Sequence, residues 1–145
     1  MNELIIKENI KVEDMIYEIR GKQVMLDSDL AKLYETDTKR INEAVRRNIE
    51  KFPERFSWKL MSEELNILWS QFATANISKK SRSTPRVFTE QGVAMLATVL
   101  KTKIATQITI QIMDAFVEMR KYIGSNILEQ KYINRLVIKD HERIN

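Results

Sequence analysis

Residues 28 to 52 read SDLAKLYETDTKRINEAVRRNIEKF, and this stretch predicts two helices joined by a tight turn. In the first helix the apolar residues recur at helical spacing and make one face: Leu30, Leu33 and Tyr34. Asp27 is a plausible N-cap for this helix, and Asp37 or Thr38 can cap the next one. The pattern is typical of a helix-turn-helix pair, with Glu35 at the turn position that usually holds glycine. That position would require a left-handed or altered backbone at Glu35.

The second helix carries most of the positive charge of the pair. Residues 38 to 52 contain five cations and two acids, whereas residues 27 to 37 contain one lysine among four acids. One apolar stripe is predicted to face inward: Ile41, Val45, Ile49 and Phe52. Pro53 ends the helix. A basic helix supported by a shorter partner helix is the arrangement that docks in a DNA major groove.

The polar face of the second helix supplies the candidate DNA-binding residues: Lys39, Arg40, Asn42, Glu43, Arg46 and Arg47. Arginine and lysine can bind guanine, asparagine can bind adenine, and glutamate can accept from cytosine N4, each good pair being worth about 1–3 kcal/mol of discrimination. A basic outer face is more often simply solvated, so from pattern and charge alone DNA binding and solvation are equally supported.

A second basic stretch, residues 79 to 86, has four cations and no acid: Lys79, Lys80, Arg82 and Arg86. Such a loop can act as a wing that contacts phosphates beside the groove. The alternative is a flexible loop kept soluble by its charge, and the sequence favours neither.

The composition provides few of the residues that catalytic sites use. The chain has 145 residues, a net charge of +4, three glycines, no cysteine and one histidine, His141. These counts exclude metal sites built from histidine and cysteine, and no glycine-rich phosphate loop is present. Paired acids such as Asp27 with Asp29 are best explained as first-turn acids that complement a helix dipole. We therefore expect no enzyme activity, no cofactor and no metal. No apolar run approaches the ~20 residues of a membrane span, so we expect a cytoplasmic protein.

The remaining patterns predict an α+β domain that is mostly helical. Residues 1 to 14 are expected to form a loose arm. Arg20-Gly21-Lys22-Gln23, with glycine at its first central position, predicts a type II′ β-hairpin. Short strands are predicted at 56–60 and 86–88, and helices start at Ser62, Thr89 and Thr102. The domain spans 15–123, and 124–145 is a last helix that links to a second domain or contributes to a homodimer.

Several motifs, in order along the chain, resemble those of the ORF-6 N-terminal domain family, a branch of the phage KilA-N superfamily. They are Ile19-Arg-Gly-Lys-Gln-Val24, Asp29-Leu-Ala-Lys-Leu-Tyr34, Thr38-Lys-Arg40, Asn42-Glu43, Arg47-Asn48, Arg55-Phe56, Ser70-Gln-Phe-Ala-Thr74, Phe88-Thr-Glu-Gln-Gly-Val-Ala-Met-Leu96, Ile110-Gln-Ile-Met113 and Ala115-Phe116. The resemblance covers roughly Met15 to Arg120. It implies a small α+β DNA-binding domain of phage and prophage regulators and antirepressors, often fused to a variable C-terminal domain. Glu35 departs from the family's usual glycine, and Thr102-Lys103 replaces a more usual Ser-Glu helix start.

Residues and resemblance together predict sequence-selective binding to double-stranded DNA by a phage or prophage regulator. The alternative is a protein-interaction module, in which the basic helix contacts and inactivates a repressor protein without reading DNA. A nuclease is a weaker third hypothesis because no catalytic cluster is evident. A homodimer through residues 103–145 is a further expectation.

Overall fold

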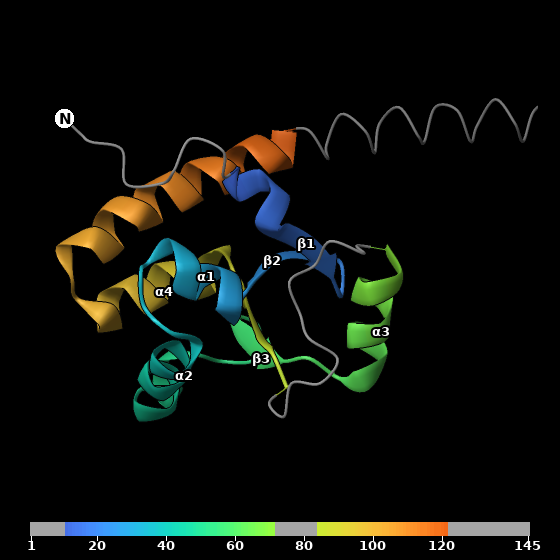
Figure 1. Ribbon diagram of the computed structural model, residues 1–145, viewed down its shortest axis with the longest axis horizontal. Coiled ribbons are helices and arrows are strands. Elements are labelled where there is room, and N and C mark those ends of the chain that lie inside the picture. Colours follow the sequence, from blue (N-terminus) through green and yellow to red (C-terminus); the bar gives the residue numbers. More distant parts are fainter. Residues whose placement is uncertain (1–10, 72–83, 122–145) are drawn as a thin grey trace, which may run out of the picture.

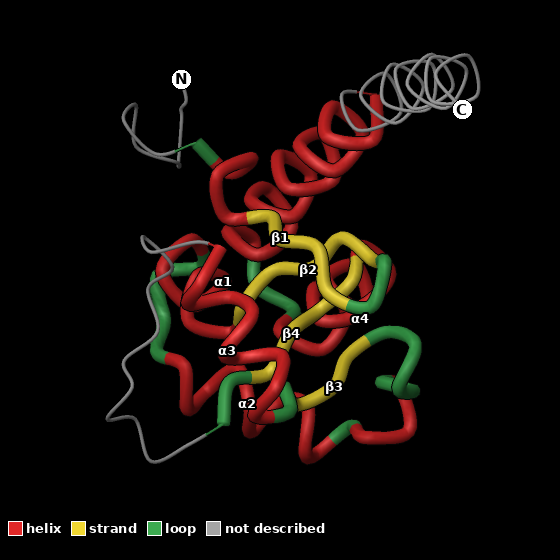
Figure 2. Tube along the Cα trace, turned by 90° about the vertical axis from the view of Figure 1, so that its right-hand side faces the viewer, coloured by secondary structure: helices red, strands yellow, loops and turns green. Residues whose placement is uncertain are grey.

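A four-stranded antiparallel sheet organises the chain. The computed structural model describes residues 11–71 and 84–121. The strands are β1 (Ile16–Ile19), β2 (Lys22–Leu26), β3 (Ser57–Lys59) and β4 (Arg86–Thr89), and they lie side by side in the order β1-β2-β4-β3. Figure 2 shows this order from β1 down to β3 at the sheet edge. The strands predicted at 56–60 and 86–88 are present as β3 and β4, and they pair with each other.

Helices make up most of the described chain. They are α1 (Asp27–Leu33), α2 (Thr38–Arg47), α3 (Ser62–Gln71), α4 (Glu90–Leu100) and a helix that runs from residue 103 to residue 121, where the described range ends. Two 3-10 turns, η1 (Val12–Met15) and η2 (Ile49–Lys51), complete the elements. The predicted class, α+β and mostly helical, is confirmed.

The predicted C-terminal helix at 124–145 lies outside the described residues, as do Lys79, Lys80 and Arg82. Of the predicted arm, residues 1–10 also lie outside. Val12, however, is only 6 % exposed and packs into the core, so this part of the 1–14 stretch belongs to the fold.

The two faces of the sheet bury two different sets of side chains, because successive strand residues point to opposite sides. Met25 and Phe88 join the larger core, with α1, α2, α4 and the 103–121 helix. Val24 and Val87, each next to one of those residues, pack with α3 through Leu68. Figure 1 shows this arrangement, with α3 on one side of the strands and the other helices on the opposite side.

The hairpin is present, but its turn differs from the predicted type II′. Ile19 pairs with Lys22, so the loop consists of Arg20 and Gly21 alone. Both have positive φ, 58° and 71°. Two left-handed residues in a two-residue loop are the mark of a type I′ turn, which matches the twist of the flanking strands. Gly21 therefore occupies the second central position, one place later than the sequence suggested.

Two predicted helix details are also wrong. Leu26, not Asp27, is the N-cap of α1, and Asp27 is already helical. The stripe of α2 is shorter than expected, because the helix ends at Arg47, and Asn48 Nδ2 donates to the Ala44 carbonyl 2.9 Å away. Ile41 and Val45 are buried as predicted, whereas Ile49 falls in η2 and is 55 % exposed. Phe52 returns to the core.

Candidate functional site

The turn between α1 and α2 is fixed by backbone hydrogen bonds and by one left-handed residue. Glu35 has φ of 57°, which confirms the left-handed geometry expected at this position. Thr36 N donates to the Ala31 carbonyl at 2.9 Å, and this bond closes the end of α1. Asp37 then caps α2, its Oδ1 accepting from Arg40 N at 2.9 Å. The angle between the two helices is thus set locally, within five residues.

The buried face of α2 packs against the core. Ile41 and Val45 are at most 1 % exposed and pack in the same cluster as Leu30 and Ala31 of α1. Ala31 has a small side chain and lies in this cluster, which leaves room for the two helices to pack together. The helix pair is therefore part of the main core, and the outer face of α2 points away from that core.

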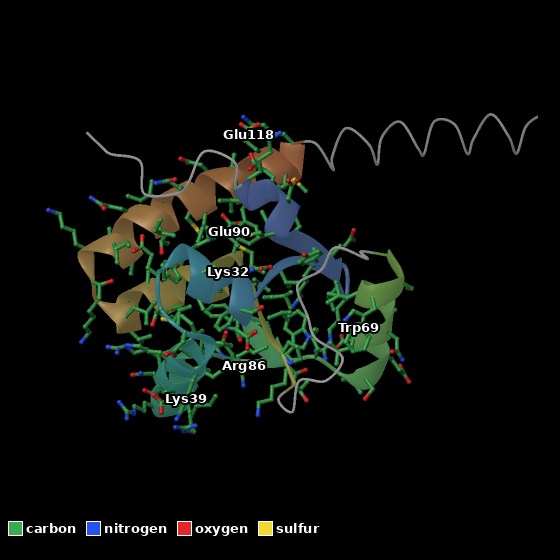
Figure 3. The ribbon with its side chains drawn as sticks, viewed as in Figure 1. Lys32, Lys39, Trp69, Arg86, Glu90 and Glu118 are labelled. Carbon is green, nitrogen blue, oxygen red and sulfur yellow. The ribbon has the colours of Figure 1, made fainter. Side chains whose placement is uncertain are left out.

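The outer face of α2 is basic and open to solvent. Lys39, Arg40, Arg46 and Arg47 are all exposed. Figure 3 shows Lys39 pointing away from the body of the protein at its lower edge. Arg46 lies 3.9 Å from the Glu43 carboxylate. Within the described part of the chain, the other three cations of this face form no ion pair. These residues are available to an external anion.

A single carboxylate oxygen joins α1, α2 and β4. Asp27 Oδ2 accepts from Asn42 Nδ2 at 2.9 Å and from the backbone N of Arg86 at 3.1 Å. Its other oxygen accepts from Ser28 N. Asp27 is 3 % exposed, and a buried carboxylate with several donors is a strong contact. Asp27 therefore sets where α2 lies relative to the sheet, a role that no local sequence pattern revealed.

Asn42 faces this junction and not the solvent. Its Nδ2 donates both to Asp27 and to the Thr38 carbonyl, 3.1 Å away, so both amide hydrogens are bound within the protein. Among the six candidates on α2, Asn42 is thus a positioning residue in this structure. The other five lie together on the outward side of the helix.

Arg86 belongs to strand β4 and not to the preceding loop. It is half-buried, and its Nη1 donates to Ser57 Oγ at 3.1 Å on the neighbouring strand. Burial lowers the pKa of the Arg86 guanidinium, and the nearby Asp27 carboxylate partly offsets that shift. Arg86 lies next to the middle of α2, because its backbone N and the Asn42 amide share one acceptor oxygen.

Outside this region the described residues offer little chemistry. No group of three or more histidine, cysteine or acidic side chains gathers there as a metal site would require. No described helix is long and apolar enough to cross a membrane. An open cleft lies beyond the other end of β4, near Gly21, Arg55 and Glu90, and one of its walls is an ion pair between Glu90 and Arg120.

Comparisons with known proteins identify one family to which this sequence is similar. No curated protein and no solved structure matches the sequence. A family model, that of the ORF6N domain, matches residues 14–99. That range runs from the 3-10 turn before β1 almost to the end of α4, and so it contains the helix pair and all four strands. The match covers more than half of the chain, and the protein therefore belongs to the ORF6N domain family.

Proposed function

We propose that this chain is the sequence-selective, double-stranded DNA-binding domain of a phage or prophage regulator, acting in the bacterial cytoplasm. The observation that carries the proposal is the outer face of α2. It presents exposed cations on a helix whose other side is buried and whose turn and cap are fixed. The family is of the phage regulatory or antirepressor type, which supports the same proposal.

The proposed roles follow from position along α2. Lys39 and Arg40 lie in the first turn, the part of a recognition helix that usually reaches base edges, and Glu43 lies one turn further along. Arg46 and Arg47 lie at the C-terminal end and are placed for bases or phosphate. Glu43 can accept from cytosine N4 or repel wrong sites. Asn42 holds the helix at the Asp27 junction.

Two further parts of the proposal concern residues beyond the helix pair. Lys79, Lys80 and Arg82 supply phosphate contacts from the segment that precedes β4. A homodimer forms through the 103–121 helix and the residues after it. This second part is supported by Ile110 and Val117, which are 58 % and 38 % exposed and lie seven residues apart on one helix face.

Alanine substitution tests the assignment of α2. Arg40→Ala and Arg47→Ala should each weaken duplex binding about 5- to 100-fold, the range expected for loss of a phosphate or base contact. Binding is measured by fluorescence anisotropy and folding by thermal melting. Because both side chains are exposed and form no ion pair among the described residues, melting should shift by only a few degrees. Unfolding of either variant would make these arginines structural and would contradict the assignment.

The rival function is a protein-interaction module that inactivates a repressor by direct contact. The Glu43–Arg46 pair favours it, since a carboxylate on this face repels DNA phosphates but can pair with a cation of a protein partner. Salt dependence separates the two. With about four to six phosphate contacts, log K against log salt should have a slope near −4 to −5. A flat slope, or no duplex binding at low salt, would favour the protein partner.

A further inference from the structure

An exposed lysine on the sheet edge was not identified by sequence reasoning. Lys59 ends β3, the edge strand, and its side chain is exposed. In the antiparallel register it stands directly opposite Arg86 of β4. Residues paired in this way project from the same face of the sheet.

That face is the one that carries the helix pair. Ser57 pairs with Phe88, which lies in the same core cluster as α1 and α2. Lys59 and Arg86 are each two residues from that pair along their strands, so they project to the same side. Trp58, between Ser57 and Lys59, points to the opposite core with α3.

Lys59 and Arg86 lie beside α2 as well as on the face of the sheet that the helix pair covers. Arg86 N and Asn42 Nδ2 both donate to Asp27 Oδ2, at 3.1 and 2.9 Å. Lys39 and Arg46, three residues before and four after Asn42, flank it on the helix surface. Figure 3 shows Lys39 and Arg86 along the same lower edge of the molecule.

The pairing is unfavourable for the isolated protein. Like charges directly opposite each other on neighbouring strands destabilise a sheet. Among the described residues, no acid forms an ion pair with Lys59 or with Arg86, although the buried Asp27 carboxylate lies near the Arg86 guanidinium. Arg86 is held in place by Ser57 Oγ, whereas Lys59 is free to reach outward. An external anion between the two cations would offset their repulsion.

We propose that Lys59, with Arg86 beside it, binds a backbone phosphate of the DNA strand that borders the groove entered by α2. The inference rests on the proposed function and extends the contact surface from the helix onto the sheet edge. A phosphate contact of this kind adds affinity and fixes register but reads no base.

Three variants at matched charge test the proposal: Lys59→Ala, Arg47→Ala and the control Lys11→Ala. Lys11 is an exposed lysine that directly precedes η1, and it forms no ion pair among the described residues. Figure 1 shows η1 in blue at the top of the molecule, away from α2. Each variant removes one positive charge, so a purely global charge effect would be equal in all three. Circular dichroism verifies folding, and Lys59→Gln replaces Lys59→Ala if the alanine variant is unfolded.

Lys59→Ala should weaken binding about 3- to 10-fold for every duplex tested and reduce the magnitude of the salt slope by about 1, as loss of one phosphate contact predicts. Base preference should stay unchanged. Lys11→Ala should resemble the wild type. If Arg47→Ala weakens binding but Lys59→Ala matches the control, the phosphate contact is wrong while the proposed function stands. If the wild-type protein binds no duplex, both are overturned.

Discussion

Glu35 holds a left-handed backbone, φ 57°, in the turn on which the orientation of α2 depends. This conformation costs a residue with a side chain about 1 kcal/mol, whereas glycine adopts it freely. Glu35 is exposed, so its side chain offers little compensation in packing. The turn is thus held by its hydrogen bonds and by the core beneath it, against the preference of its own residue.

We expect Glu35→Gly to raise the free energy of unfolding by about 0.5–1 kcal/mol, because relief of the left-handed strain exceeds the added chain entropy. Urea unfolding measures the change. The control is Glu18→Gly, an exposed glutamate in the extended backbone of β1, which should lose stability. If both variants lose stability to the same extent, the strain at Glu35 is not significant.

Asp29 is an acidic residue that is buried in the folded protein. It is 3 % exposed, and its Oδ2 has no hydrogen-bond partner among the described residues. Burial raises the pKa of Asp29 to about 6, with Lys32 lowering it and Asp27 raising it further. Asp29 in turn contributes, after burial, to the raised pKa of the Tyr17 hydroxyl.

The pH dependence follows from the direction of this shift. The folded protein holds the Asp29 proton more tightly than the unfolded chain, whose carboxyl has the ordinary pKa of 3.8. The contribution to stability is therefore full below pH 3.8 and is lost as the pH rises through about 6. The loss has an upper limit of about 3 kcal/mol.

Asp29→Asn should accordingly raise the melting temperature at pH 7.5 and have a much smaller effect near pH 4.5. The amide resembles the protonated carboxyl in shape and carries no charge. The comparison is Asp114→Asn, an exposed acid on the 103–121 helix, which should change little at either pH. An equal gain for Asp29→Asn at both pH values would show that the ionised carboxylate is not the source of the instability.

Among the elements, α4 depends on a close approach that only glycine permits. Thr89 caps the helix, its Oγ1 accepting from Gly92 N at 3.2 Å. At Gly92 the helix passes so near the segment before β3 that an added Cβ would lie 2.2 Å from the Phe56 carbonyl oxygen. That carbonyl also accepts from Thr89 N at 2.9 Å, so it cannot move away freely.

Gly92→Ala should therefore destabilise the protein by about 2–3 kcal/mol, the typical cost of overpacking. The result is diagnostic because alanine normally favours a helix over glycine by about 1 kcal/mol. Chemical denaturation provides the measurement, with Ala94→Gly at an exposed position of α4 as the comparison. A Gly92→Ala variant as stable as the wild type would mean that the Phe56 segment is not fixed against α4.

The elements also show what local patterns can and cannot predict. The starts of α2 at Thr38, of α3 at Ser62 and of α4 at Glu90 follow from caps and apolar spacing, which are properties of neighbouring residues. The hairpin was predicted for the same reason. Its turn type was not, because Arg-Gly-Lys places glycine at either central position until the strand register selects one.

At the candidate site, the sequence again predicts only those features that depend on neighbouring residues. The exposed cations of α2 follow from helical periodicity. The Asp27 junction does not follow from it, because Asp27 binds residues that are 15 and 59 positions away in the sequence. The Lys59–Arg86 pair does not follow from it either, because α3 lies between the two strands in the sequence. Alternation in 56–60 could have indicated that Lys59 is exposed, but not which residue it faces.

At the scale of the whole molecule, two opposite surfaces of the described protein differ in character: one is basic and the other exposes apolar residues. The outer face of α2, with Arg86 and Lys59 beside it, forms one basic side at the edge of the sheet. The 103–121 helix lies on the opposite side of the molecule, as Figure 1 shows, and exposes Ile110 and Val117. This separation would allow one face to bind DNA while the other face binds a second copy of the chain.

Selection from a library of random duplexes tests the central claim most directly. Wild-type protein is incubated with the library near 100 mM salt, and bound duplexes are recovered and sequenced over several rounds, with Arg47→Ala as the parallel control. The account predicts enrichment of one consensus by the wild type, palindromic if the chain dimerises, and weak or no enrichment by the variant. If wild-type protein enriches no sequence, or if Arg47→Ala enriches the same consensus equally well, α2 is not a DNA-reading helix.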